Sequence, residues 1–148
     1  MRYVLSDYEK LHGHFLEDLS VGMSASFEKT VSEDDIVLFA EISGDTNPVH
    51  LNNEFAEQTI FKERIAHGML SAAFISTVFG TKLPGPGAIY MNQNLSFKAP
   101  VRIGDTVVAK VTLREINGKR VSFGCECCVG DTVVLEGDAT LMVSRRPK

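Results

Sequence analysis

The longest stretch of this sequence without a charged side chain runs from Ile65 to Thr81. Its apolar residues predict a helix from about Ala66 to Thr81, and they lie on almost every side of that helix. A helix that is apolar all round is expected to be buried all round. The pattern therefore predicts a central helix with other elements packed against every face of it.

The residues that follow this helix are typical of strands. Pro84-Gly85-Pro86-Gly87 breaks the chain, and Asn117-Gly118 is a strong hairpin signal further on. The strands expected after the break span Ala88 to Phe97, Thr106 to Ile116, Arg120 to Val129 and Thr132 to Val143. Together with an earlier strand over Met23 to Val31, they predict an antiparallel sheet of about five strands.

A shorter helix is expected before the central one. Ser32 has the character of an N-cap, Asp35 follows it as a variant capping box, and Gly44 suits a C-terminal stop. The next residues, Asp45 to His50, are expected to form a loop, because the proline among them prevents the helix from continuing. Another short helix is expected over Asn52 to Thr59.

The order of these elements favours an α+β fold in which an antiparallel sheet wraps around one long central helix. This arrangement is the hot-dog fold. We interpret residues 1–148 as a single domain, because the length is usual for one domain and the sequence contains no repeat, low-complexity tract or linker.

Net charge and hydropathy narrow the possible partners. The formal net charge is −4, whereas nucleic-acid binding requires a basic surface, so we expect no nucleic-acid partner. The apolar stretches are too short and too polar for a membrane span, and the N-terminus does not have the pattern of a secretory signal. We therefore expect a soluble, cytoplasmic protein that does not bind membranes.

The three cysteines lie together at positions 125, 127 and 128. Cys125 and Cys128 have the spacing of a redox or metal-binding pair, but residues three apart on a strand face opposite ways. No second cluster of cysteine or histidine supplies the other ligands of a zinc site. We interpret the cysteines as buried structural residues and expect no metal site.

The loop from Asp45 to His50 carries the strongest candidate chemistry. A carboxylate and an imidazole five residues apart, linked through Pro48, can converge on one small volume. Such a pair can move protons during the addition of water to an activated alkene. The spacing alone leaves two readings open, since an aspartate after a helix-ending glycine is commonly a turn residue and a lone histidine is commonly structural.

A second candidate lies at the start of the central helix. Gly68 can offer its backbone N–H to a thioester oxygen without a side chain in the way, and a helix start favours negative charge. Gly68 could equally well serve only to permit close packing. We interpret His67 beside it as a capping or packing residue.

Several motifs, in the expected order, resemble the MaoC-like (R)-specific enoyl-CoA hydratases. They are Phe39-Ala40-Glu41-Ile42-Ser43-Gly44-Asp45-Thr46-Asn47-Pro48-Val49-His50 followed after five residues by Ala56, then Ile65-Ala66-His67-Gly68-Met69-Leu70, Leu83-Pro84-Gly85-Pro86-Gly87 and Leu95-Ser96-Phe97-Lys98-Ala99-Pro100. The resemblance covers roughly residues 15 to 143, and the motif with its aspartate, asparagine and histidine is specific.

This resemblance implies a hot-dog fold and hydration of trans-2-enoyl-CoA to (R)-3-hydroxyacyl-CoA. By position, Asp45 and His50 are the catalytic pair, Asn47 orients them, and the Gly68 N–H polarises the thioester carbonyl. Ser76 touches the reacting water or its partners, or else bonds only to its own helix. The substrate is an acyl-CoA or acyl-carrier-protein thioester, no separate cofactor is needed, and the resemblance implies a homodimer or a higher homo-oligomer.

Three other functions are compatible with the same fold. A thioesterase or an acyl-carrier-protein dehydratase of this fold commonly carries a carboxylate on or beside the central helix, whereas Ile65 to Thr81 contains none. A non-catalytic acyl-CoA-binding subunit would not need the set formed by Asp45, Asn47 and His50.

Overall fold

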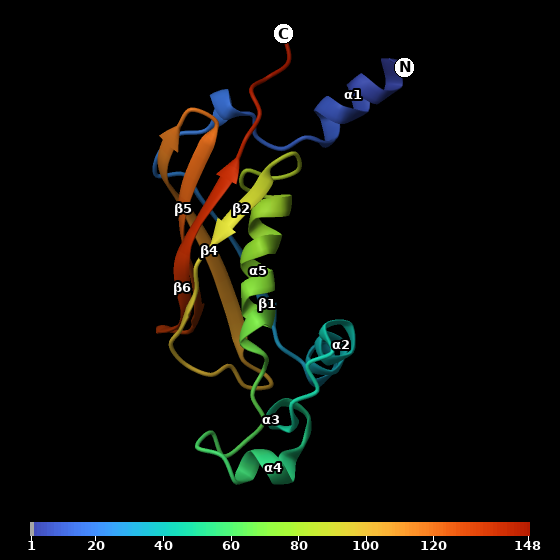
Figure 1. Ribbon diagram of the computed structural model, residues 1–148, viewed down its shortest axis with the longest axis vertical. Helices are drawn as coiled ribbons and strands as arrows, with labels where there is room; N and C mark the ends of the chain where they lie inside the picture. The colour runs from blue at the N-terminus through green and yellow to red at the C-terminus, as the bar shows by residue number, and fades with distance from the viewer. Residues whose placement is uncertain (1) are drawn as a thin grey trace.

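The computed structural model describes residues 2–148, and one antiparallel sheet packs along the long helix α5 (Gly68–Thr81) in it (Figure 1). The sheet follows the order β1-β4-β5-β6-β2, with the short strand β3 also paired to β6. Its strands are β1 (Ser24–Thr30), β2 (Ile89–Gln93), β3 (Ser96–Phe97), β4 (Thr106–Asn117), β5 (Arg120–Val129) and β6 (Thr132–Met142). The α+β hot-dog fold predicted from the sequence is confirmed.

The expected strand over Ala88 to Phe97 is divided into β2 and β3, which pair with successive parts of β6. Asn94 lies between them and its side-chain oxygen accepts a hydrogen bond from the Asp138 N–H at 3.0 Å. The Asn94 carbonyl lies so close to Gly137 that a Cβ on that glycine would be 1.9 Å from it. This close approach interrupts the ladder, and a sheet of six strands results.

The core lies between the sheet and α5. Val107, Ala109, Val111 and Leu113 alternate along β4 with 0% exposure and face the helix. Cys125 and Cys127 of β5 belong to the same layer, and burial raises the pKa of Cys125 to about 11 and that of Cys127 to about 12, whereas Cys128 is only partly buried and lies outside this cluster. These thiols are therefore protonated at neutral pH, as expected of structural cysteines.

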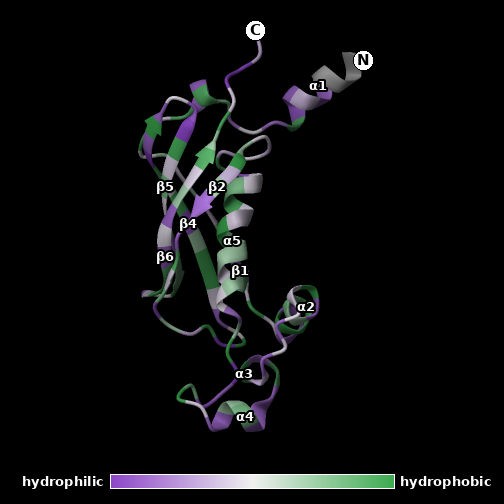
Figure 2. Cartoon of the chain, viewed as in Figure 1, coloured by the Kyte–Doolittle hydropathy of each residue, from purple (hydrophilic) through white to green (hydrophobic). Residues whose placement is uncertain are grey.

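The prediction that α5 is buried on every side is wrong for this single chain. Met69, Ala73, Ser76 and Gly80 recur at helical spacing and are all exposed, Met69 by 55%. The sheet covers only one side of α5, and the open side carries no charged residue (Figure 2). We call these four residues the open face of α5.

Three short helices, α2 (Glu33–Ser43), α3 (Pro48–Leu51) and α4 (Asn53–Glu57), lie beyond the N-terminal end of α5 (Figure 1). The capping box at the start of α2 is confirmed, because Ser32 and Asp35 bond each other's backbone N–H groups. Gly44 ends α2 with a φ of 78°, in the left-handed region that favours glycine. No helix among residues 2–148 is long and apolar enough to cross a membrane.

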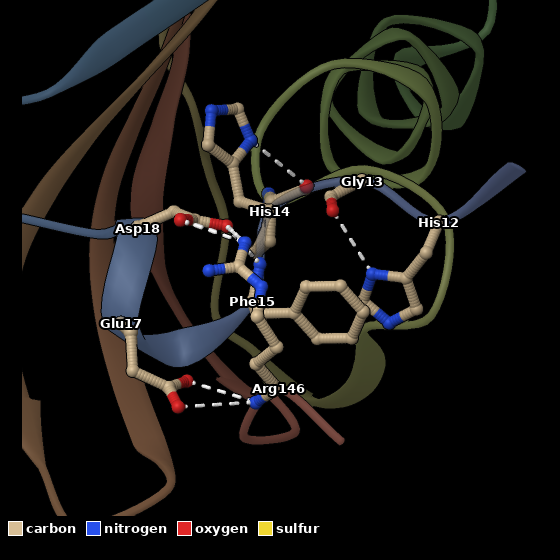
Figure 3. A network of polar contacts seen from close by, with 8 residues as sticks. His12, Gly13, His14, Phe15, Glu17, Asp18 and Arg146 are labelled. Carbon is tan, nitrogen blue, oxygen red and sulfur yellow. Dashed lines mark hydrogen bonds and ion pairs between the residues drawn. The ribbon is translucent and has the colours of Figure 1, made fainter. Parts of the chain in front are cut away.

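Arg146 joins the C-terminal segment to residues 15–18, which lie between α1 (Arg2–Leu11) and β1 (Figure 3). Its guanidinium contacts the Asp18 carboxylate at 2.8 Å, and its backbone N–H donates to Glu17 at 2.9 Å. The guanidinium also lies 5.0 Å from the centre of the Phe15 ring, which stacks on His12 at 3.9 Å. The segment before β1 is therefore packed against the segment after β6.

Candidate active site

Asp45 lies just after α2 and His50 lies on α3, and we call residues 45–50 the bend. The expected loop is shorter than predicted, because α3 begins at Pro48 and already contains His50. Proline is well suited to the first position of a helix, where its missing N–H costs nothing. The short helix turns the imidazole back toward the carboxylate, and His50 Nε2 lies 3.9 Å from Asp45 Oδ2.

The imidazole of His50 is held in one tautomer. Its Nδ1 lies 2.8 Å from the Ile65 carbonyl oxygen, which can only accept a hydrogen bond. Nδ1 therefore carries the proton, and Nε2 presents a lone pair on the side of Asp45. Burial lowers the pKa of His50 below its ordinary value of 6.5, so the ring is neutral at pH 7 and available as a base.

Asn47 contributes to the bend through backbone contacts. Its side-chain oxygen accepts a hydrogen bond from the Val49 N–H at 3.1 Å and so caps α3. Its own N–H donates to Asp45 Oδ1 at 3.2 Å. Asn47 is thus hydrogen-bonded both to the Asp45 carboxylate and to the backbone of the helix that carries His50.

Gly68 is the first residue of α5, where the helix leaves its N–H groups without internal partners. A Cβ on Gly68 would lie 2.6 Å from Cε1 of Phe97. Only glycine fits under this ring without a shift of the ring. The backbone amide and the aromatic ring therefore lie side by side at one place.

An apolar cavity of about 470 Å³ opens beside Gly68. Aromatic and aliphatic side chains dominate its lining, and Lys98 and His67 contribute polar atoms. The apolar lining includes Phe61, Ile65, Ala66, Met69, Phe97, Pro100, Val101, Val134 and Leu135. Such a cavity suits a hydrocarbon chain whose polar end stops at the start of α5.

Ser76 is not among the residues that line this cavity: it lies on the open face of α5, about two turns after Met69, which does line it. Ser71 is the serine of α5 that lines the cavity, and it is only 3% exposed. It lies three residues after Gly68 and so shares its side of the helix. This spacing could have singled it out in the sequence.

His67 is the N-cap residue of α5 and is 2% exposed, which agrees with its interpretation as a capping or packing residue, but the sequence did not predict its contacts with Asp45 and His50. His67 Nε2 lies 2.9 Å from the Asp45 carbonyl oxygen, and its ring stacks on His50 with centroids 3.8 Å apart. One ring nitrogen of each histidine and one Asp45 carboxylate oxygen lie within 4.8 Å of one another. Such a trio has donor types that could hold a metal ion, although one nitrogen of each ring already bonds to a carbonyl.

Arg64 is a further residue that the sequence did not single out. It is only 8% exposed, its Nε–H donates to the His50 carbonyl at 2.7 Å, and its Nη1 lies 2.7 Å from Glu33 Oε1. A buried guanidinium next to a predicted catalytic residue could have been found only through the fold, since 14 residues separate the two in sequence.

Comparisons with known proteins agree with this architecture. The family described as MaoC like domain matches residues 19–136. The chain is 60% identical over 135 residues to an (R)-specific enoyl-CoA hydratase of Rhodospirillum rubrum, covering 90% of this chain and 94% of that protein. It is 50% identical over 134 residues to a 3-hydroxybutyryl-CoA dehydratase of Methylorubrum extorquens, covering 89% and 85% of the two chains.

Solved structures show the same likeness. The unliganded R-hydratase PhaJ1 of Pseudomonas aeruginosa superposes with a TM-score of 0.87 at 40% identity. The match covers 92% of this chain and 89% of that structure. Sequence and structure together place this chain in the MaoC-like dehydratase domain family.

Proposed function

We propose that this protein catalyses the reversible, (R)-specific addition of water to a trans-2-enoyl-CoA, with Asp45 and His50 as the acid/base pair. The observation that carries the proposal is the 3.9 Å separation of Asp45 Oδ2 and His50 Nε2, beside a helix start and an apolar cavity. The relatives named as hydratase and dehydratase support the same chemistry, since these are two directions of one reaction.

In the hydration direction, a water held by Asp45 and His50 gives one proton to the pair while its oxygen bonds to the β-carbon. The π electrons move toward the thioester, and the negative charge develops on the carbonyl oxygen. The Gly68 N–H and the positive end of α5 stabilise that oxygen. The pair then returns a proton to the α-carbon, so one water molecule is added and no other reactant is consumed.

The site divides these roles between two helix ends. Asp45 follows the C-terminal end of α2, which is the negative end of that helix dipole. Gly68 lies at the N-terminal end of α5, which favours negative charge. A proton acceptor and an oxyanion site are thereby placed at helix ends of opposite polarity.

The substrate class follows from the shape and polarity of the cavity. An acyl group enters the apolar space beside Gly68, and the thioester stops at the start of α5. We favour CoA as the carrier, because both of the close relatives named above act on CoA thioesters by their names. A thioesterase receives less support, since α5 carries no carboxylate that could attack the carbonyl or activate a water there.

A homodimer is part of this proposal. The open face of α5 and the exposed apolar residues Ile89, Tyr90 and Met91 of edge strand β2 would be covered by a second copy. An apolar edge strand with unpaired backbone groups is unusual on a free surface. In the dimer Ser76 would lie in the interface, where it could reach a reacting water; that role stays a prediction.

Replacing Asp45 by asparagine tests the acid/base assignment. Asp45→Asn should lower kcat for hydration of crotonyl-CoA by about 10²–10⁴-fold, because the amide cannot take up a proton. Loss of enoyl absorbance and release of free thiol are followed in the same sample, and chiral analysis of the product determines its stereochemistry.

The matched control is Asp34→Asn, an exposed acid in the first turn of α2, which should keep the wild-type rate. Absorbance loss without thiol release supports the hydratase. Thiol release, or an (S) product, would contradict the proposal, as would a folded Asp45→Asn variant with the wild-type rate.

A further inference from the structure

We propose that residues 64–67 form a clamp, in which Arg64 and His67 are positioning residues that hold Asp45 and His50 at their reacting separation. The inference rests on the proposed function and adds two residues to its site. Each of the two catalytic residues has its own carbonyl oxygen bound by a side chain of the clamp.

The clamp contacts the bend at successive positions. His67 Nε2 lies 2.9 Å from the Asp45 carbonyl, and the Arg64 Nε–H donates to the His50 carbonyl at 2.7 Å. Between them the Ile65 N–H donates to the Val49 carbonyl at 3.3 Å, and the Ile65 carbonyl accepts from His50 Nδ1 at 2.8 Å. Both the backbone and the imidazole of the bend are thus fixed by one short segment.

The direction of the His67 hydrogen bond is fixed by chemistry. A carbonyl oxygen only accepts, so His67 Nε2 carries the proton and donates to Asp45. His67 is 2% exposed, and its Nδ1 is buried without a hydrogen-bond partner among the described residues.

Asp45 depends on anchoring of its backbone more than His50 does. Its side chain is 52% exposed, and among residues 2–148 its carboxylate accepts a hydrogen bond only from within the bend, from the Asn47 N–H at 3.2 Å. A carboxylate anchored only locally would move with its backbone. The His67 N–H and the stacked imidazole rings connect that backbone to the start of α5, which also carries Gly68.

Arg64 fixes the other end of the bend through its hydrogen bond to the His50 carbonyl. Its guanidinium is buried, and its charge is balanced by Glu33 on α2, whose side chain is 64% exposed. If Arg64 had only a structural role, its important contact would be the ion pair that joins it to Glu33 of α2. The two contacts can be separated by experiment, because Nε serves the His50 carbonyl and Nη1 serves Glu33.

The test of His67 compares its replacement by glutamine with its replacement by asparagine, whose side-chain amide is shorter. The glutamine side-chain nitrogen can occupy the place of Nε2 and donate to Asp45, whereas the asparagine nitrogen occupies the place of Nδ1 and falls short. His67→Gln should keep kcat within a few-fold of wild type, and His67→Asn should lower it by about 10–100-fold with KM nearly unchanged. The assay follows hydration of crotonyl-CoA by wild-type and variant full-length protein.

The test of Arg64 uses its two partners in the same way. Arg64→Met removes both contacts and should lower kcat by about tenfold or more. Glu33→Gln leaves the guanidinium on the His50 carbonyl and should keep the wild-type kcat. If Glu33→Gln lost as much activity as Arg64→Met, the ion pair with Glu33 of α2 would be the important contact. The positioning role proposed for Arg64 at the His50 carbonyl would then be overturned.

A control separates positioning from stability. Val121→Ala creates a cavity in β5 away from the site and should lower the melting temperature while leaving kcat unchanged. Equal kcat for His67→Gln and His67→Asn, with both folded, would overturn the role given to His67. Failure of the proposed function looks different, since wild-type protein would then not hydrate crotonyl-CoA at all.

Discussion

The chemistry proposed for this protein depends on the protonation state of one histidine. His50 is 8% exposed and lies 3.9 Å from Asp45, so desolvation and a nearby carboxylate act on it in opposite directions. Desolvation is the larger effect, and the pKa of His50 is lowered from 6.5. The neutral ring, with its lone pair on Nε2, is therefore the resting form at pH 7.

This state predicts the pH dependence of the reaction. Protonation of His50 removes the base, so kcat/KM should fall only as the pH drops below 6.5. The unfolded chain binds more protons than the folded one in that range, so the free energy of unfolding should also decrease as the pH falls from 6.5 through the lowered pKa. A kcat/KM profile for crotonyl-CoA checks this; an acidic limb above pH 7 would contradict it.

Gly68 gives a second prediction at the scale of one residue. Gly68→Ala should lower kcat/KM by about 10²–10³-fold, because its methyl group lies where the thioester oxygen must approach the N–H. The same methyl group would also collide with the Phe97 ring at 2.6 Å. The double variant Gly68→Ala/Phe97→Ala removes that collision and should remain slow. Recovery of the rate would mean that Gly68 serves only to accommodate the ring.

At the scale of elements, the sequence predicted the parts of the fold that depend on local patterns. The cap at Ser32, the stop at Gly44 and the β4–β5 hairpin are all present, the last with Gly118 at φ 62°. Each depends on residues close together in the chain. The division of Ala88 to Phe97 into two strands could not be predicted, because it results from Asn94 lying over Gly137 of another strand.

The residues of the candidate site also fall into those that a local motif predicts and those that depend on contacts distant in sequence. Asp45, Asn47 and His50 belong to one short motif, and the structure places the carboxylate and the imidazole together. Arg64 and His67 contact Asp45 and His50 across 14 or more residues of sequence, and Ser71 lines the cavity because of the geometry of α5. The residue types of Arg64 and His67 do not distinguish them from ordinary core or surface residues, so only the folded arrangement reveals these two. The spacing of Ser71 from Gly68 could have indicated it.

At the scale of the whole molecule, the open face of α5 is the feature that a single chain leaves unexplained. The sequence predicted burial on all sides from hydrophobicity alone, and the chain by itself covers only the sheet side. The remaining side is apolar and contains small residues at positions 73, 76 and 80. A second copy packed there would reconcile the composition of the helix with its exposure.

Ala73→Arg tests this packing, since it places a bulky charge on the open face without crowding the core of its own chain. Wild-type protein should sediment at about twice 16.2 kDa, and the variant should sediment near 16.2 kDa. Asp131→Arg, in the exposed β5–β6 turn, adds the same side chain elsewhere and should leave the mass unchanged. Wild-type protein that sediments as a monomer would contradict the proposed dimer.

The bend, its clamp and the oxyanion amide all belong to residues 45–68, whereas the far wall of the cavity comes from residues 97–101 and from Val134 and Leu135. The proposed reacting groups therefore all lie in the earlier stretch. The later stretch contributes part of the cavity lining and none of these groups. Substitutions in the later stretch can lengthen or shorten the acceptable acyl group while proton transfer is preserved. Descendants of one ancestral sequence could in this way diverge in substrate preference without rebuilding their reaction centre.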